Sequence, residues 1–75
     1  MSTRSFKVVQ WNCNRLKPKL SFMHKVVDSN DIFCLQETWL EPTDNFYMND
    51  FNIYRKDRSS GSKGGGLIIG VRKDL

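Results

Sequence analysis

The stretch DIFCLQETW, residues 31–39, constrains the fold most because an apolar run passes directly into polar residues. Its apolar part, residues 32–35, is rich in strand formers and is typical of a strand buried on both faces inside a parallel sheet. Gln36 and Glu37 follow at once. Ligands of open α/β sheets bind at the carboxyl ends of strands, so Glu37 is the first candidate for chemistry. A solvated glutamate at a strand end is the alternative at this point.

A strand, a helix and a second strand are predicted over residues 6–37. Residues 6–13, FKVVQWNC, favour a strand with apolar residues on both faces, which suits the interior of a sheet better than its edge. Pro18 suits a first helical turn, and Asn30 suits a left-handed helix stop. Apolar residues at helical spacing predict an amphipathic helix between them: Leu16, Leu20, Met23 and Val27.

This βαβ order implies that the two strands run parallel. Parallel strands end at the same side of a sheet, so Asn12 and Asn14 are expected beside Glu37. Neighbouring strands lie about 4.8 Å apart, which lets these groups share one small ligand.

The second half of the chain predicts a β-hairpin. Residues 39–50 are expected to form a loop, with room for a short helical turn, packed down by Phe46 and Tyr47. Residues 51–57 and 67–72 predict two antiparallel strands. The GSKGGG sequence between them matches neither phosphate-loop pattern and precedes a strand rather than a helix. It therefore predicts a turn whose glycines adopt positive φ.

Length and composition favour one small intracellular domain, nuclear or cytoplasmic. The 75 residues contain no apolar run near the ~20 residues that span a bilayer, and the N-terminus lacks a signal-peptide pattern. Cys13 and Cys34 are expected to be buried, reduced and unpaired. With His24 they lack the closely spaced pairs of a zinc site, and His24 is expected on the surface.

The net charge is +4, and the basic residues form two groups. Such groups neutralise phosphates and attract polyanions, although solvated side chains without a binding role are the alternative. The first group is Arg15, Lys17, Lys19 and Lys25, and the second, a candidate nucleic-acid contact, is Arg55, Lys56, Arg58 and Lys63.

Taken together, the segments WNCN, DIFCLQETWL, FNIYRKDR and KGGGLIIGVRKDL resemble the start of an endonuclease/exonuclease/phosphatase domain. More narrowly, they are similar to the apurinic-type endonuclease domain of non-LTR (LINE-type) retrotransposons. The resemblance covers residues 6–75 and leaves residues 1–5 as a disordered tail. It implies an α/β fold: the N-terminal part, a β-α-β unit followed by a β-hairpin, of a four-layer α/β sandwich truncated at its C-terminal side.

The resemblance also implies roles for individual residues. Glu37 matches the glutamate that holds Mg²⁺ or Mn²⁺ at the scissile phosphate, and Asn12 matches the asparagine beside that metal and phosphate. Asn14 stands where many members have an aspartate, and it would support the site together with Gln36. The implied partners are DNA and a reverse-transcriptase region of a parent polyprotein, with no membrane.

The implied function is that of an N-terminal fragment of a Mg²⁺-dependent DNA endonuclease. The fragment is expected to be inactive alone, because nothing here matches the late aspartate and histidine that complete the family's site. The main alternative is a phosphatase of the same superfamily. A non-catalytic basic fragment that binds nucleic acid, or a decayed fragment, are the others.

Overall fold

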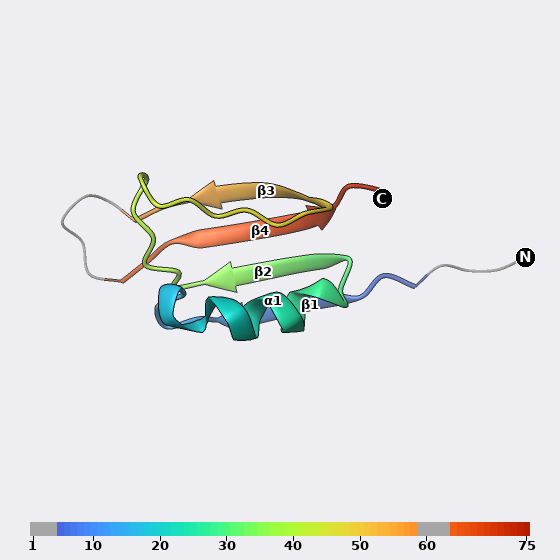
Figure 1. Ribbon diagram of the computed structural model, residues 1–75, viewed down its shortest axis with the longest axis horizontal. Helices are drawn as coiled ribbons and strands as arrows, with labels where there is room; N and C mark the ends of the chain where they lie inside the picture. Colours follow the sequence, from blue (N-terminus) through green and yellow to red (C-terminus); the bar gives the residue numbers. More distant parts are fainter. Residues whose placement is uncertain (1–4, 59–63) are drawn as a thin grey trace, which may run out of the picture.

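The computed structural model describes residues 5–58 and 64–75. The described residues form a four-stranded sheet in the order β1-β2-β4-β3, with one α-helix (Figure 1). The elements are β1 (Val8–Asn12), the 3₁₀ turn η1 (Lys17–Lys19), α1 (Leu20–Asp28), β2 (Ile32–Gln36), β3 (Phe51–Lys56) and β4 (Leu67–Arg72). Of the predicted tail, residues 1–4 lie outside the described residues and Ser5 is exposed.

Strand pairing confirms the predicted βαβ unit and hairpin. β1 and β2 are parallel neighbours, with Asn12 opposite Gln36. β3 and β4 are antiparallel, and β4 also pairs antiparallel with β2, so the sheet is mixed. The described residues thus form an α/β fragment of the predicted class.

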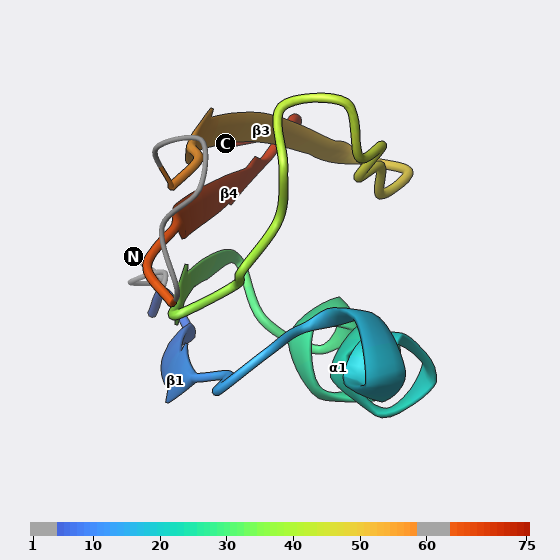
Figure 2. The ribbon, with the colours of Figure 1, turned by 90° about the vertical axis from the view of Figure 1, so that its left-hand side faces the viewer.

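One face of this sheet is covered and the other is open. α1 and residues 39–50, which we call the covering loop, lie on the same side of the sheet (Figure 2). Phe33 and Leu35 of β2 point to the covered side and are fully buried, whereas Cys34 between them is half-buried. The prediction that β2 is buried on both faces is therefore wrong, because in the described residues only one face has a cover.

β1 lies at an edge of the described sheet, so its predicted interior position is also wrong. Its side chains alternate between the half-buried Val9 and Trp11 and residues on the open face, where Val8 is 61% exposed. The alternation of side chains shows which face of a strand each residue occupies and not whether another strand pairs on each side, which explains the error.

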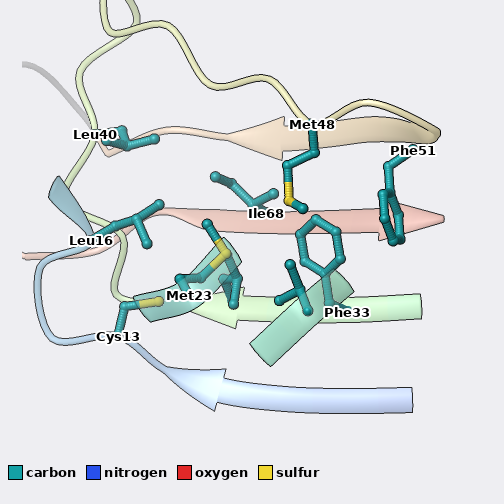
Figure 3. Close-up of a cluster of buried hydrophobic side chains, with 10 residues drawn as sticks. Cys13, Leu16, Met23, Phe33, Leu40, Met48, Phe51 and Ile68 are labelled. Atoms are coloured by element: carbon teal, nitrogen blue, oxygen red, sulfur yellow. The ribbon is translucent and has the colours of Figure 1, made fainter. Parts of the chain in front are cut away.

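The core lies between the sheet and its cover (Figure 3). The ring of Phe33 meets that of Phe51 edge to face, with 5.1 Å between the ring centres. Cys13 and Cys34 are both free, as predicted. Cys13 is buried, also as predicted, but Cys34 is only half-buried because its face of β2 has no cover in the described residues. Burial raises the pKa of the Cys13 thiol to about 11. The buried apolar residues are Cys13, Leu16, Met23, Val27, Phe33, Leu35, Leu40, Met48, Phe51 and Ile68.

The helix begins later than predicted and ends differently. Pro18 lies in η1, and α1 starts at Leu20. Asn30 is not left-handed; its side-chain amide instead donates to the carbonyl of Val26 at 2.9 Å. His24 is exposed, as predicted. Among the described residues, no helix is both long and apolar enough to cross a bilayer.

Charged side chains fasten the covering loop to β3 and η1. The guanidinium of Arg55 donates to the carbonyls of Asp44 and Glu41 at 2.8 and 3.0 Å, and Lys17 pairs with Asp44 at 2.8 Å. The loop contains turns but no helix. Phe46 is half-buried against the core as predicted, but Tyr47 is 68% exposed, so its predicted packing is wrong.

Acidification is expected to weaken this attachment. The side chain of Lys17, followed by the backbone N–H of Glu41, lowers the pKa of Asp44 below its ordinary value of 3.8. A depressed folded-state pKa stabilises the fold above the unfolded-state value, and this contribution is lost as pH falls through the folded-state pKa. Asp44→Asn should therefore flatten the pH dependence of stability in this acid range, measured by urea unfolding. Asp74→Asn, outside the contact, is the control, and equal acid dependence in wild type and Asp44→Asn would contradict the prediction.

Candidate functional site

The candidate site lies where β1 and β2 end, at the same side of the sheet (Figure 1). Beyond the strands, the backbone N–H of Cys13 donates to the carbonyl of Gln36 at 2.8 Å. The N–H groups of Arg15 and Leu16 donate likewise to Glu37 and Thr38 at 2.9 and 3.0 Å. Residues 13–16 therefore run beside residues 36–38, so the predicted site residues lie on adjacent segments.

Residues 64–66, the glycine segment, lie on the other side of Glu37. The backbone N–H of Trp39 donates to the carbonyl of Gly65 at 2.9 Å. All three glycines have positive φ, which confirms that part of the turn prediction. An added Cβ at Gly66 would lie 2.3 Å from the hydroxyl oxygen of Thr38, so this close approach requires glycine. Glu37 is thus enclosed by two segments distant from each other in sequence.

The Glu37 carboxylate is held by two donors. Its Oε2 accepts hydrogen bonds from the backbone N–H of Gly65 at 2.7 Å and from Nε1 of Trp39 at 2.9 Å. Glu37 and Trp39 have φ values of 54° and 58°, a left-handed conformation that non-glycine residues rarely adopt. The bond from Gly65, followed by that from Trp39, lowers the pKa of Glu37, so the side chain is a carboxylate at neutral pH. Such backbone outliers cluster at functional sites.

Asn12 and Gln36 lie side by side through the strand register, on the open face. Oδ1 of Asn12 accepts from the backbone N–H of Asn14 at 3.2 Å, and Oε1 of Gln36 accepts from Nε2 of Gln10 at 2.8 Å. Within the described part of the chain, Asn12 and Glu37 share no hydrogen bond. The fold brings both residues to the carboxyl ends of β1 and β2, while different partners hold each side chain.

Both basic groups contain side chains that bind other parts of the protein, among them Lys17 of the first group, which pairs with Asp44 of the covering loop. Lys19 donates to the carbonyls of Cys13 and, at 2.9 Å, of Asn14, so it stabilises the segment that carries Asn14. In the second group, Arg55 and Arg58 bind the covering loop, Arg58 through Glu41 at 2.6 Å. Lys56 is exposed at the end of β3, and Lys63 lies outside the described residues.

The donor set fits a hard divalent cation. Carboxylate and amide oxygens are its preferred ligands, and Mg²⁺ commonly takes only one or two carboxylates while water and substrate phosphate complete its shell. Glu37 supplies an ionised carboxylate and Asn12 an amide oxygen. No group of three or more His, Cys, Asp or Glu side chains that could hold a metal occurs in residues 5–58 and 64–75. One carboxylate and one amide oxygen would leave most of the cation's ligand positions to water or to other oxygen ligands.

The sequence did not identify Trp39 or Gly65 as partners of Glu37. Trp39 was expected only to begin a loop, and Gly65 only to form a turn. Three glycines before an apolar strand do signal a close backbone approach, but they do not say which side chain is approached.

Comparison with known families gave a match over most of the chain. The model of the Endonuclease/Exonuclease/phosphatase family matches residues 9–75, a range that includes Asn12, Glu37 and the glycine segment. A comparison with curated proteins gave no match.

Proposed function

Because the chain belongs to the endonuclease/exonuclease/phosphatase family, we propose that it is the N-terminal part of a Mg²⁺-dependent DNA endonuclease domain of the non-LTR retrotransposon type. The observation that carries this proposal is the ionised Glu37 at the end of β2, held by Gly65 and Trp39. The YRKDR and KGGG segments favour an endonuclease over a phosphatase, because they resemble retrotransposon endonucleases more closely. DNA is the substrate, and a reverse-transcriptase region is the expected companion in the parent polyprotein.

Glu37 and Asn12 have complementary roles in this proposal. Glu37 offers its carboxylate to Mg²⁺ or Mn²⁺, which when bound stabilises negative charge that develops on the phosphate. Oδ1 of Asn12 is engaged by the N–H of Asn14 and keeps a second lone pair for the cation. Its Nδ2 group can donate to a phosphate oxygen as charge develops there. Asn14 supports the site through its backbone N–H, which donates to Asn12, and Gln36 supports it through its position opposite Asn12 in the parallel pair.

The proposal includes inactivity of this chain by itself. Hydrolysis needs a group that takes a proton from the attacking water. His24, the only histidine, lies on α1, where its ring faces Phe46 with 6.5 Å between the ring centres. It lies over the covering loop and not at the strand ends. In this proposal the described residues supply the cation-binding part of a site, while the base that the resemblance implies, a later aspartate, has no match in this sequence.

The open face of the sheet supports the proposed sandwich architecture. Leu67 and Ile69 of β4 are 38% and 37% exposed there, and Val8 of β1 is more exposed. In a four-layer sandwich a second sheet would cover this face.

Metal binding tests the proposed role of Glu37. Wild type should bind Mn²⁺, measured by electron paramagnetic resonance, and Glu37→Gln should lose this binding because it removes the anionic ligand. Glu41→Gln is a matched control, since Glu41 lies on the covering loop and its carboxylate pairs with Arg58. Equal binding by wild type and Glu37→Gln would exclude Glu37 as a ligand.

Supercoiled plasmid incubated with the wild-type chain and Mg²⁺ should stay intact. Nicking by wild type that Glu37→Ala abolishes would contradict the proposed inactivity.

Binding to duplex DNA is expected to depend on Lys56. Removing one phosphate contact by Lys56→Ala should reduce the slope of log affinity against log salt by about 0.9. Lys73→Ala, beyond the opposite end of the sheet, should leave the slope unchanged. Arg55→Ala should instead lower stability, because it releases the covering loop. Fluorescence anisotropy at several salt concentrations measures the slope, and salt-independent binding would contradict the DNA-binding role.

A further inference from the structure

The two oxygens of the Glu37 carboxylate have different surroundings. An ionised carboxylate oxygen has two lone pairs. Oε2 receives hydrogen bonds from Gly65 and Trp39 at 2.7 and 2.9 Å, which occupy its acceptor capacity. Oε1 accepts no hydrogen bond from the described residues. A cation that approaches Glu37 therefore finds only Oε1 available.

The two donors are themselves fixed in place. The backbone N–H of Trp39 donates to the carbonyl of Gly65 at 2.9 Å, while its indole and the N–H of Gly65 both donate to Glu37. These bonds form a closed arrangement of three residues. Gly64 leaves little space beside it, since an added Cβ there would lie 3.0 Å from Oε2 and 3.3 Å from the indole nitrogen. Two-oxygen coordination would take one lone pair of Oε2 and would therefore break at least one of these two bonds.

We propose that Trp39 and Gly65 restrict Glu37 to one-oxygen coordination through Oε1, and so favour Mg²⁺ or Mn²⁺ over Ca²⁺. This inference rests on the proposed function. Mg²⁺ requires near-octahedral geometry with few protein ligands, whereas Ca²⁺ takes six to eight oxygens and often binds both oxygens of one carboxylate. A carboxylate with one oxygen already hydrogen-bonded can still bind Mg²⁺ through the other oxygen, but it denies Ca²⁺ a second oxygen ligand. Trp39 is thus a positioning residue that determines metal selectivity.

The test compares Mn²⁺ binding, and its competition by Ca²⁺, in wild type and Trp39→Phe. The phenylalanine keeps an aromatic ring but removes the N–H donor. Loss of such an outer-shell donor should weaken Mn²⁺ binding by about 10-fold. Ca²⁺ affinity should not fall with it, so Ca²⁺ should displace Mn²⁺ more readily. Trp11→Phe, which removes the other tryptophan from the inner face of β1, should retain the wild-type affinity ratio.

A second measurement needs no variant. Isotope-edited infrared spectroscopy of wild type labelled at glutamate should show, on Mn²⁺ addition, the wide separation of carboxylate stretches that marks one-oxygen coordination. A narrow separation, typical of two-oxygen coordination, would overturn the inference even if Trp39→Phe fails to fold.

Failure of the inference can be told apart from failure of the proposed function. A folded Trp39→Phe variant with the wild-type ratio of Mn²⁺ to Ca²⁺ affinity would overturn the inference, while loss of binding in Glu37→Gln would still support the metal role. Unchanged Mn²⁺ binding in Glu37→Gln would overturn the metal role, and the inference with it.

Discussion

Replacing Gly70 with alanine is expected to remove a large part of the free energy of unfolding of the protein. An added Cβ would lie 2.1 and 2.2 Å from two ring carbons of Phe33. That ring is fully buried and meets the rings of Phe51 and Phe46, so it has little room to move. Overpacking typically destabilises by about 1–3 kcal/mol. A core this small rarely supplies more than about 3–5 kcal/mol, so the effect is large. Urea unfolding followed by circular dichroism measures it.

Two variants test whether the Phe33 ring is the cause. Gly70→Ala combined with Phe33→Leu should recover part of the stability lost by Gly70→Ala, because the smaller side chain makes space. Ile69→Ala, at a neighbouring position 37% exposed on the open face, should have a small effect. An unchanged urea midpoint for Gly70→Ala would show that the inner face has room for a methyl group.

Gly66→Ala is expected to lower stability and to loosen the Glu37 carboxylate as well. The backbone at Gly66 has a φ of 101°, and an added Cβ would lie 2.3 Å from Oγ1 of Thr38, which is 1% exposed. Backbone strain of this kind costs about 1–3 kcal/mol. Displacement of the glycine segment should also move the N–H of Gly65 away from Glu37. The urea midpoint of unfolding and the Mn²⁺ affinity should both fall.

The double variant Gly66→Ala/Thr38→Ala separates the two causes. It removes the contact with the Thr38 hydroxyl but keeps the strained backbone, so it should recover only part of the stability. Full recovery would assign the effect to the contact alone. A Gly66→Ala variant with wild-type stability and Mn²⁺ affinity would show that the glycine segment does not need glycine here.

The sequence predicted the elements better than their arrangement. Apolar runs located β2 and β4, alternation located β3, and the crossover helix predicted the parallel pairing of β1 and β2. The position of β1 at an edge was missed because the alternation of its side chains shows which face of the sheet each one occupies. It does not show whether another strand pairs on each side. The end of α1 was missed because Asn30 has a local alternative, in which its side chain bonds to Val26 instead of its backbone turning left-handed.

The candidate site was predictable in part for similar reasons. The neighbouring positions of Glu37 and Asn12 were predictable because both residues lie at the ends of strands that the crossover helix makes parallel. The hydrogen bonds from Trp39 and Gly65 to Glu37 were not predictable. They need a left-handed backbone at Glu37 and Trp39, and they need pairing between segments far apart in the chain. Charge alone also did not distinguish Arg55, which binds the covering loop, from the exposed Lys56.

The strand order has a consequence for how the chain folds during translation. β4 lies between β2 and β3 in the sheet although it follows both in the chain. Chains emerge from the ribosome at about 5–20 residues per second, and non-local strand pairing is slow. Until β4 emerges, β3 has no partner in this sheet and β2 is paired with β1 alone. The nascent chain therefore exposes unpaired strands, which invite association with other chains, up to the moment when its last described strand is made.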